Sequence, residues 1–133
     1  MRHAWMIIAA LLTTTPVMAK TPAARGEAAL AKLLEGRVAG KPVRCLPLQT
    51  VRGTQVFDNA AIVYRGNHDT LFVNRTQGAQ FLDRDDILVS RVIGTQLCRL
   101  DSIRLLDRLT RTERGFAVLD DFIPYTKPDK AKR

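Results

Sequence analysis

The chain has 133 residues, a formal net charge of +8 and an apolar content of 46%. This length suits a single domain, and two cysteines with two histidines, without metal-like spacing, are too few soft ligands for a zinc site. The basic excess favours anionic partners such as polyanionic glycolipid, a membrane surface or nucleic acid, or else only keeps a small exported domain soluble.

Residues 1–19 have the three parts of a secretory signal peptide. Arg2 precedes an apolar run over 4–12, and Val17 and Ala19 stand where a small-residue cleavage site needs them. The run is too short for a transmembrane helix, and no later segment is apolar enough to span a bilayer. We therefore expect cleavage after Ala19 and a periplasmic or secreted location, without a transmembrane segment in the mature chain.

Residues 20–40 are expected to form an N-terminal helical segment. Thr21 is a suitable cap and proline is favoured at the first helical position, which Pro22 would occupy. Leu30, Leu33 and Leu34 make one apolar stripe at helical spacing, and a glycine at 36 or 40 would end the helix. The stripe is narrow and has no aromatic residue, so it favours packing on the chain's own domain over binding to a membrane.

Residues 41–125 read as a β domain. Segments 61–65 and 70–74 are β-rich and flank Gly66-Asn67-His68-Asp69, which predicts a hairpin with a four-residue connection. Further strands are expected near 49–57, 87–93, 102–107 and 116–119, with Phe81 and Leu82 as apolar anchors of the polar segment before 87. Residues 126–133 are basic and proline-containing, and we expect a disordered tail.

This pattern predicts a mainly β fold: an antiparallel meander or small barrel of about six strands, behind one N-terminal helix.

Two cysteines in an exported chain most often pair with each other, although two free thiols or an intermolecular bond are alternatives. Cys45 and Cys98 are 53 positions apart, and a bond across a loop of that length stabilises by about 4 kcal/mol in the chain-entropy model. Their Cα atoms would then lie roughly 4.4–6.8 Å apart.

Two groups of residues suggest catalysis or metal binding only weakly. His68 beside Asp69 has the residue types of a general base pair, but it falls in an expected turn and no nucleophile can be assigned to it. Asp83, Asp85 and Asp86 offer oxygens to calcium, but their spacing departs from the EF-hand pattern. We therefore assign no catalytic residue, metal ligand or cofactor.

Five arginines follow one another around the second cysteine and the strand after it, and together they form a candidate anion-binding patch: Arg99, Arg104, Arg108, Arg111 and Arg114. Nucleic-acid domains usually add exposed aromatic residues for stacking. Here most aromatic residues fall where a core is expected, which argues against nucleic acid as the partner.

Several short motifs extend over about 44–125: Cys45-Leu46-x-Leu48, Asp58-x-x-x-Ile62-x-Tyr64, Val73-Asn74, Leu97-Cys98-x-x-Asp101-x-Ile103 and Leu119-x-x-Phe122-x-Pro124-Tyr125. With them the chain resembles an uncharacterised domain-of-unknown-function family of small exported proteobacterial proteins of sphingomonad and xanthomonad type. Members often have two further cysteines, near Ala79-Gln80 and Ala117, which are absent here. The resemblance implies that those two pair with each other and leave Cys45 with Cys98. It supplies no activity, cofactor or catalytic residue.

Together these observations predict an uncharacterised periplasmic or secreted, non-enzymatic module that binds an anionic envelope component or an envelope protein. An inhibitor or accessory subunit of an envelope enzyme is the alternative, and an unrecognised hydrolase comes third.

Overall fold

The structure is a computed structural model that describes residues 15–129. Most of the expected leader, residues 1–14, and residues 130–133 of the expected tail lie outside the described residues. Within 15–129, no helix is long and apolar enough to cross a membrane.

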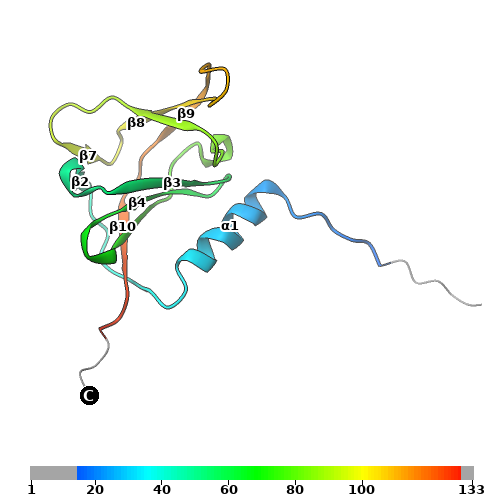
Figure 1. The fold of residues 1–133 in the computed structure, drawn as a ribbon, viewed down its shortest axis with the longest axis horizontal. Coiled ribbons are helices and arrows are strands. Elements are labelled where there is room, and N and C mark those ends of the chain that lie inside the picture. The colour runs from blue at the N-terminus through cyan, green and yellow to red at the C-terminus, as the bar shows by residue number, and fades with distance from the viewer. Residues whose placement is uncertain (1–14, 130–133) are drawn as a thin grey trace, which may run out of the picture.

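The fold is mainly β with one N-terminal helix, as the sequence predicts (Figure 1). The described elements are α1 Pro22–Leu33, β1 Val38–Ala39, β2 Cys45–Pro47, β3 Gly53–Phe57, β4 Ala61–Arg65, β5 Leu71–Asn74, β6 Ile87–Ser90, β7 Gln96–Cys98, β8 Ser102–Leu106, β9 Glu113–Val118 and β10 Phe122–Thr126. Three short 3₁₀ turns join some of them: η1 Leu48–Thr50, η2 Asn67–Asp69 and η3 Ala79–Phe81.

All strand pairs are antiparallel, and they form three sheets. The five-stranded sheet has the order β1-β10-β5-β4-β3, the three-stranded sheet the order β6-β8-β9, and β2 pairs with β7 alone. These strands do not close into one barrel, so of the two expected architectures the meander-like one describes the chain better.

The five-stranded sheet is the middle layer of the molecule, between α1 and the three-stranded sheet (Figure 1). Successive side chains of a strand point to opposite faces. On β4, Ile62 and Tyr64 therefore pack toward the three-stranded sheet, while Ala61 and Val63 pack toward α1. The strand is buried on both faces and reads as a continuous apolar run rather than an alternating one.

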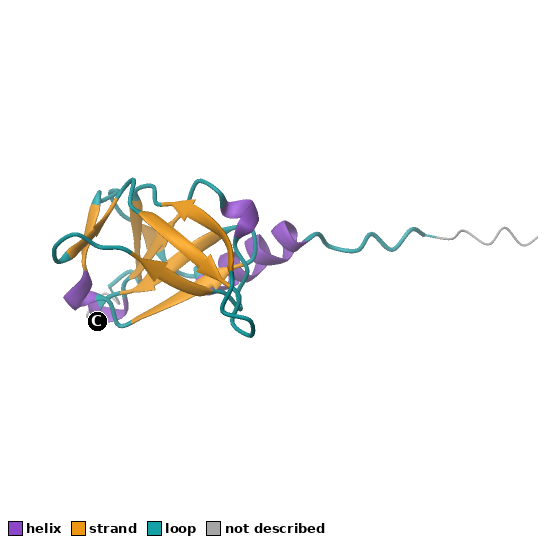
Figure 2. Cartoon of the chain, turned by 90° about the horizontal axis from the view of Figure 1, so that it is seen from above, coloured by secondary structure: helices purple, strands orange, loops and turns teal. Residues whose placement is uncertain are grey.

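Helix α1 begins as its sequence predicts but ends at Leu33, earlier than the glycine expected to end it at 36 or 40 and well short of the expected segment 20–40. The Thr21 side chain accepts a hydrogen bond from the Ala24 N–H at 3.2 Å, and Gly36 follows the helix with a φ of 71°, in the left-handed region that glycine tolerates. Leu30, which is 1% exposed, lies in the cluster between helix and sheet. The leucine stripe thus packs on the chain's own domain. In Figure 2 the segment before α1 leads away from the folded body.

Three details of the predicted elements are wrong: the length of a hairpin connection, the burial of Phe81 and the end of one strand. The hairpin of β4 and β5 forms, but Arg65 pairs with Leu71, so its connection has five residues rather than four. Phe81 is 48% exposed and is not a buried anchor, whereas Leu82 is 2% exposed. The expected strand over 87–93 ends at Ser90.

Several strands were not expected from the sequence, among them β1 and β10. β1 lies inside the segment expected to be helical. β10 is the second strand of the five-stranded sheet and extends past the expected domain boundary to Thr126, which pairs with Val38. Both depend on partners far away in sequence, which local patterns do not specify.

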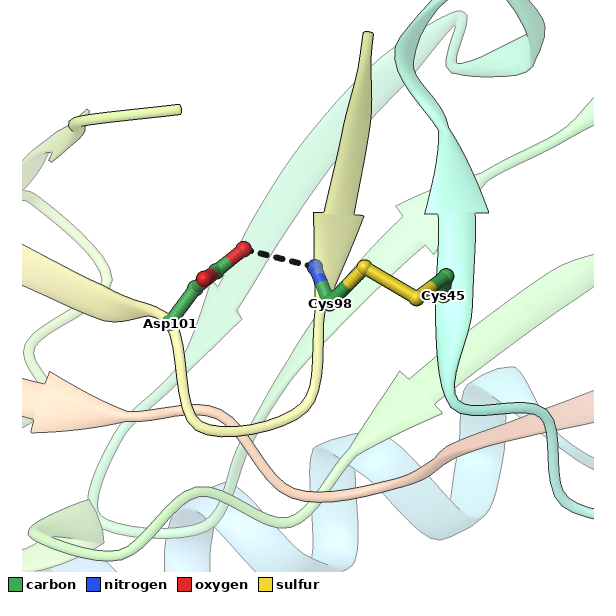
Figure 3. Close-up of a disulfide and its surroundings, with 3 residues drawn as sticks. All are labelled: Cys45, Cys98 and Asp101. Carbon is green, nitrogen blue, oxygen red and sulfur yellow. Dashed lines mark hydrogen bonds between the residues drawn. A yellow bond between two sulfur atoms is a disulfide. The ribbon is translucent and has the colours of Figure 1, made fainter. Parts of the chain in front are cut away.

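Cys45 and Cys98 form the expected disulfide, directly opposite each other on β2 and β7 (Figure 3). The flanking Arg99 N–H donates to the Arg44 carbonyl at 2.7 Å, so the cysteines occupy a non-hydrogen-bonded pair, in which Cα atoms approach to roughly 4.5 Å. This explains a Cα separation of 4.0 Å, which is shorter than expected. The outward-facing Cys98 N–H donates to Oδ2 of Asp101 at 2.7 Å.

Candidate functional site

The five arginines of the candidate anion patch are largely matched by carboxylates. Arg99 lies 3.3 Å from Oδ1 of Asp120, and Arg104 Nε donates to Oε2 of Glu113 at 2.9 Å. The Glu113 carboxylate raises the pKa of Arg104. Charge-assisted pairs of this kind satisfy the guanidinium donors that an external anion would need.

Arg114 is matched in the same way. Its Nη1 donates to Oδ1 of Asp86 at 2.6 Å, and that carboxylate is only 2% exposed. The hydrogen bond from Arg114 to Asp86 raises the arginine pKa. Arg108 Nε donates to the Asp85 carbonyl, and Arg111 is exposed in the β8–β9 turn. Of the five, only Arg108 and Arg111 form no ion pair within the described residues.

The acidic residues near 83–86 form a turn before β6. The Asp83 carboxylate accepts the Asp85 N–H at 2.9 Å, and the Asp86 carboxylate accepts the Asp83 N–H at 3.2 Å. Among residues 15–129, no three His, Cys, Asp or Glu side chains cluster in the manner of metal ligands. These carboxylates hold the turn and bind Arg114.

His68 and Asp69 lie in the η2 turn, each with a positive φ, 54° and 58°. The two oxygens of Asp69 are occupied by Lys127 Nζ at 2.7 Å and Arg37 Nη2 at 2.9 Å. The hydrogen bonds from Lys127 and Arg37 lower the pKa of Asp69. The carboxylate is therefore engaged by cations instead of orienting the exposed His68 imidazole, as a general base pair would require.

Two grooves with charged side chains in their linings lie beside the 83–86 turn. One, of about 620 Å³, runs between α1, β3 and β6, and the other, of about 340 Å³, lies under the β8–β9 turn. They share Asp85, Asp86 and Arg108. The first is lined by as many aspartates as arginines, and the second holds more aspartates than arginines, so neither has the net positive charge of a polyanion site.

A third groove, of about 320 Å³, lies beside the disulfide on the side of β2 and β5; we call it the disulfide groove. It is mostly apolar, and its lining residues come from β2, β5 and the η1 and η2 regions: Val43, Cys45, Leu46, Pro47, Thr50, Asn67, Thr70 and Phe72.

The outer face of the three-stranded sheet, turned away from the core, combines apolar side chains with Ser102, Arg104 and Glu113. Arg104 at its centre pairs with Val89 of β6 and Phe116 of β9. Val89 is 38% and Phe116 58% exposed, and Ile87, Leu106 and Val118 belong to the same face. In Figure 1 no other described element lies over β8 and β9 on the side away from β3 and β4. We call this set of residues the outer sheet face.

Sequence reasoning missed both the disulfide groove and the outer sheet face. The alternation of Ser102, Arg104 and Leu106 with the buried Ile103 and Leu105 was the one available signal for an exposed sheet face. Nothing in the sequence places η2 beside β2, which is what creates the groove.

No protein-family model, curated protein or solved structure matches this chain. The resemblance to small exported proteobacterial proteins therefore stays a prediction.

Proposed function

We propose that this protein is an extracytoplasmic, non-enzymatic binding module of the periplasm or the secreted fraction, and that it binds a partner protein. The expected leader and the Cys45–Cys98 disulfide support the location, because disulfides persist in oxidising compartments outside the cytosol. The family that this chain resembles consists of small exported proteins, and membership in it would imply the same location.

We choose a protein as the partner because of the outer sheet face. Protein interfaces are enriched in aromatic residues and arginine at their centre, and here Phe116 lies across from Arg104 on adjacent strands. Phe116 is the most exposed aromatic side chain of the described residues, at 58%. The carboxylate partners of Arg99, Arg104 and Arg114 at the same time weaken the case for an anionic envelope component at that patch.

The test is retention of a partner from an envelope extract by three immobilised proteins: the parent, Phe116→Ser and Val38→Ser. Val38 is 57% exposed on β1, in the other large sheet, and so matches Phe116 in exposure. Truncation of a central aromatic anchor typically costs about 2 kcal/mol or more, which is a loss of roughly 30-fold in affinity. A partner held equally by all three proteins, or none held by the parent, would contradict the proposal.

An inhibitor of an envelope enzyme is a second candidate, favoured by the β8–β9 turn. Leu109 at this turn is 91% exposed, and the turn is held by Asp107, whose Oδ1 accepts the N–H groups of Leu109 and Thr110, each at 2.8 Å. These hydrogen bonds lower the pKa of Asp107. A pre-ordered turn with an exposed apolar tip suits insertion into a cleft, because little entropy is lost on binding.

The variant Leu109→Ser separates the two candidates. Loss of partner binding in Leu109→Ser with full binding by Phe116→Ser would favour the inhibitor, and the reverse would favour docking on the outer sheet face.

A further inference from the structure

The disulfide groove combines an apolar lining with one polar end. Val43, Leu46, Pro47 and Phe72 contribute the apolar surface, next to Cys45 of the disulfide. Its volume of about 320 Å³ is at the small end of the range for ligand pockets, which is about 300–1,000 Å³. A single narrow apolar chain suits this space better than a ring system or a folded segment.

The polar end of the groove is lined by Asn67 and Thr70. Arg52 does not line the groove but is next to this end, because its Nε donates to Oδ1 of Asn67 at 2.9 Å. Within the described residues, the structure gives no hydrogen bond donated by the Arg52 Nη groups or the Asn67 Nδ2, and none made by the Thr70 hydroxyl. A planar guanidinium with its Nη groups available binds a carboxylate through parallel hydrogen bonds.

Arg52 is a cationic side chain on the groove's side of the five-stranded sheet. It has the strand parity of Thr54, which pairs with Tyr64 of the core-facing side, and it is bonded to a neutral amide and not to a carboxylate. Arg65 lies on the opposite side, because it pairs with Leu71 of the cluster beneath α1. Among the described residues the groove thus has one neighbouring arginine without a carboxylate partner, and such a positive charge attracts an anionic head group.

We propose that the disulfide groove binds a medium-chain carboxylate, with the alkyl chain along Val43, Leu46 and Phe72 and the carboxylate on Arg52 and Asn67. A neutral amphiphile would leave the donors unpaired, and a chainless anion would leave the apolar lining uncovered. The chain's own tail is excluded on charge, since residues 127–133 have four basic side chains and one acidic one.

This site is independent of the partner-binding proposal, because none of its lining residues belongs to β6, β8 or β9.

The experiment titrates decanoate into the ¹⁵N-labelled exported protein with its disulfide intact, and follows amide shifts. Saturable shifts at Val43, Leu46 and Phe72 are expected with decanoate. Decyl maltoside, with the same chain and a neutral head, and acetate, with the same head and no chain, should each produce much weaker shifts. Equal binding of decanoate and decyl maltoside would overturn the proposal, as would the absence of saturable shifts at these residues.

Two arginine variants isolate the head-group contact. Arg52→Gln should weaken decanoate about tenfold, because hydrogen bonds to charged groups contribute about twice as much as neutral ones. Arg111→Gln removes the same charge from the β8–β9 turn and should bind as the parent does. If both variants weakened decanoate binding equally, the arginine would act only through the protein's net charge, and the proposed head-group contact would be refuted.

A third variant, Val43→Trp, fills the groove and should abolish the shifts while the disulfide still forms. Retention of full decanoate affinity in either Val43→Trp or Arg52→Gln would place the ligand elsewhere and refute the proposal.

Discussion

At Gly26, α1 lies close against the β3–β4 turn, and replacing this glycine by alanine sets a gain in helix propensity against a loss of packing. A Cβ at this position would lie 1.8 Å from the main-chain oxygen of Asp58, whereas heavy atoms in contact need roughly 3.5 Å. The obstacle is backbone, so the helix itself has to move away from the sheet. Leu30, one turn further and 1% exposed, would then lose part of its burial.

Burial of a leucine contributes about 1.5–3 kcal/mol, while alanine is favoured over glycine in a helix by about 0.8–1.0 kcal/mol. The loss of Leu30 packing is larger than the gain in helix propensity, so Gly26→Ala should lower the free energy of unfolding by about 1–2 kcal/mol. The melting temperature, followed by circular dichroism, should fall by roughly 4–16 °C.

The exposed Ala28 supplies the matched control for this substitution. Ala28→Gly alters propensity without altering the contact with the sheet, and should cost about 1 kcal/mol. If Gly26→Ala instead raised the melting temperature, propensity alone would govern this position, and the close approach of α1 to the β3–β4 turn would be refuted.

Three further predictions concern the disulfide, a buried amide and an exposed carboxylate. Cys98→Ala, with the remaining thiol blocked, should lower stability by about 4 kcal/mol and the melting temperature by well over ten degrees, at about 4–8 °C per kcal/mol; reductant should destabilise the parent protein but leave this variant unchanged. Asn74 is fully buried, and its amide donates to the Asp120 carbonyl at 2.7 Å and accepts the Asp120 N–H at 3.0 Å. Asn74→Leu should therefore cost about 1–3 kcal/mol in denaturant unfolding, and an unchanged midpoint would show that water replaces the amide. The pKa of Asp69 is lowered by its hydrogen bond with Lys127, so its contribution to stability is present above the ordinary carboxyl pKa and is lost as the pH falls through the lowered one; Lys127→Ala should raise that pKa in an NMR titration of the carboxyl carbon, and an unmoved pKa would contradict the ion pair.

The elements that the sequence predicts correctly depend on neighbours a few residues away. Thr21 caps the start of α1 because capping is a local property. The β4–β5 hairpin follows from two β-rich segments on either side of one turn. The pairing of Cys45 with Cys98 was also predictable, since an exported chain with two cysteines has only one intramolecular pairing to choose.

The elements that the sequence does not reveal depend on long-range contacts. β10 reads as irregular in the sequence because it contains Pro124, and it becomes a strand only because β5 and β1 lie on its two sides. The predicted arginine patch was a run of like charges along the chain, but tertiary structure brings Asp86, Glu113 and Asp120 beside three of its members.

The sequence by itself therefore determined the fold class, the start of the helix, the central hairpin and the disulfide, all of which follow from short-range pattern or simple counting. Only the tertiary structure decided which charges are compensated, which sheet face stays uncovered and where the disulfide groove lies. The physical reason is that each of these depends on which side chains from distant segments come within a few ångströms of one another. That choice is made by the packing of α1 and the sheets and not by any one segment.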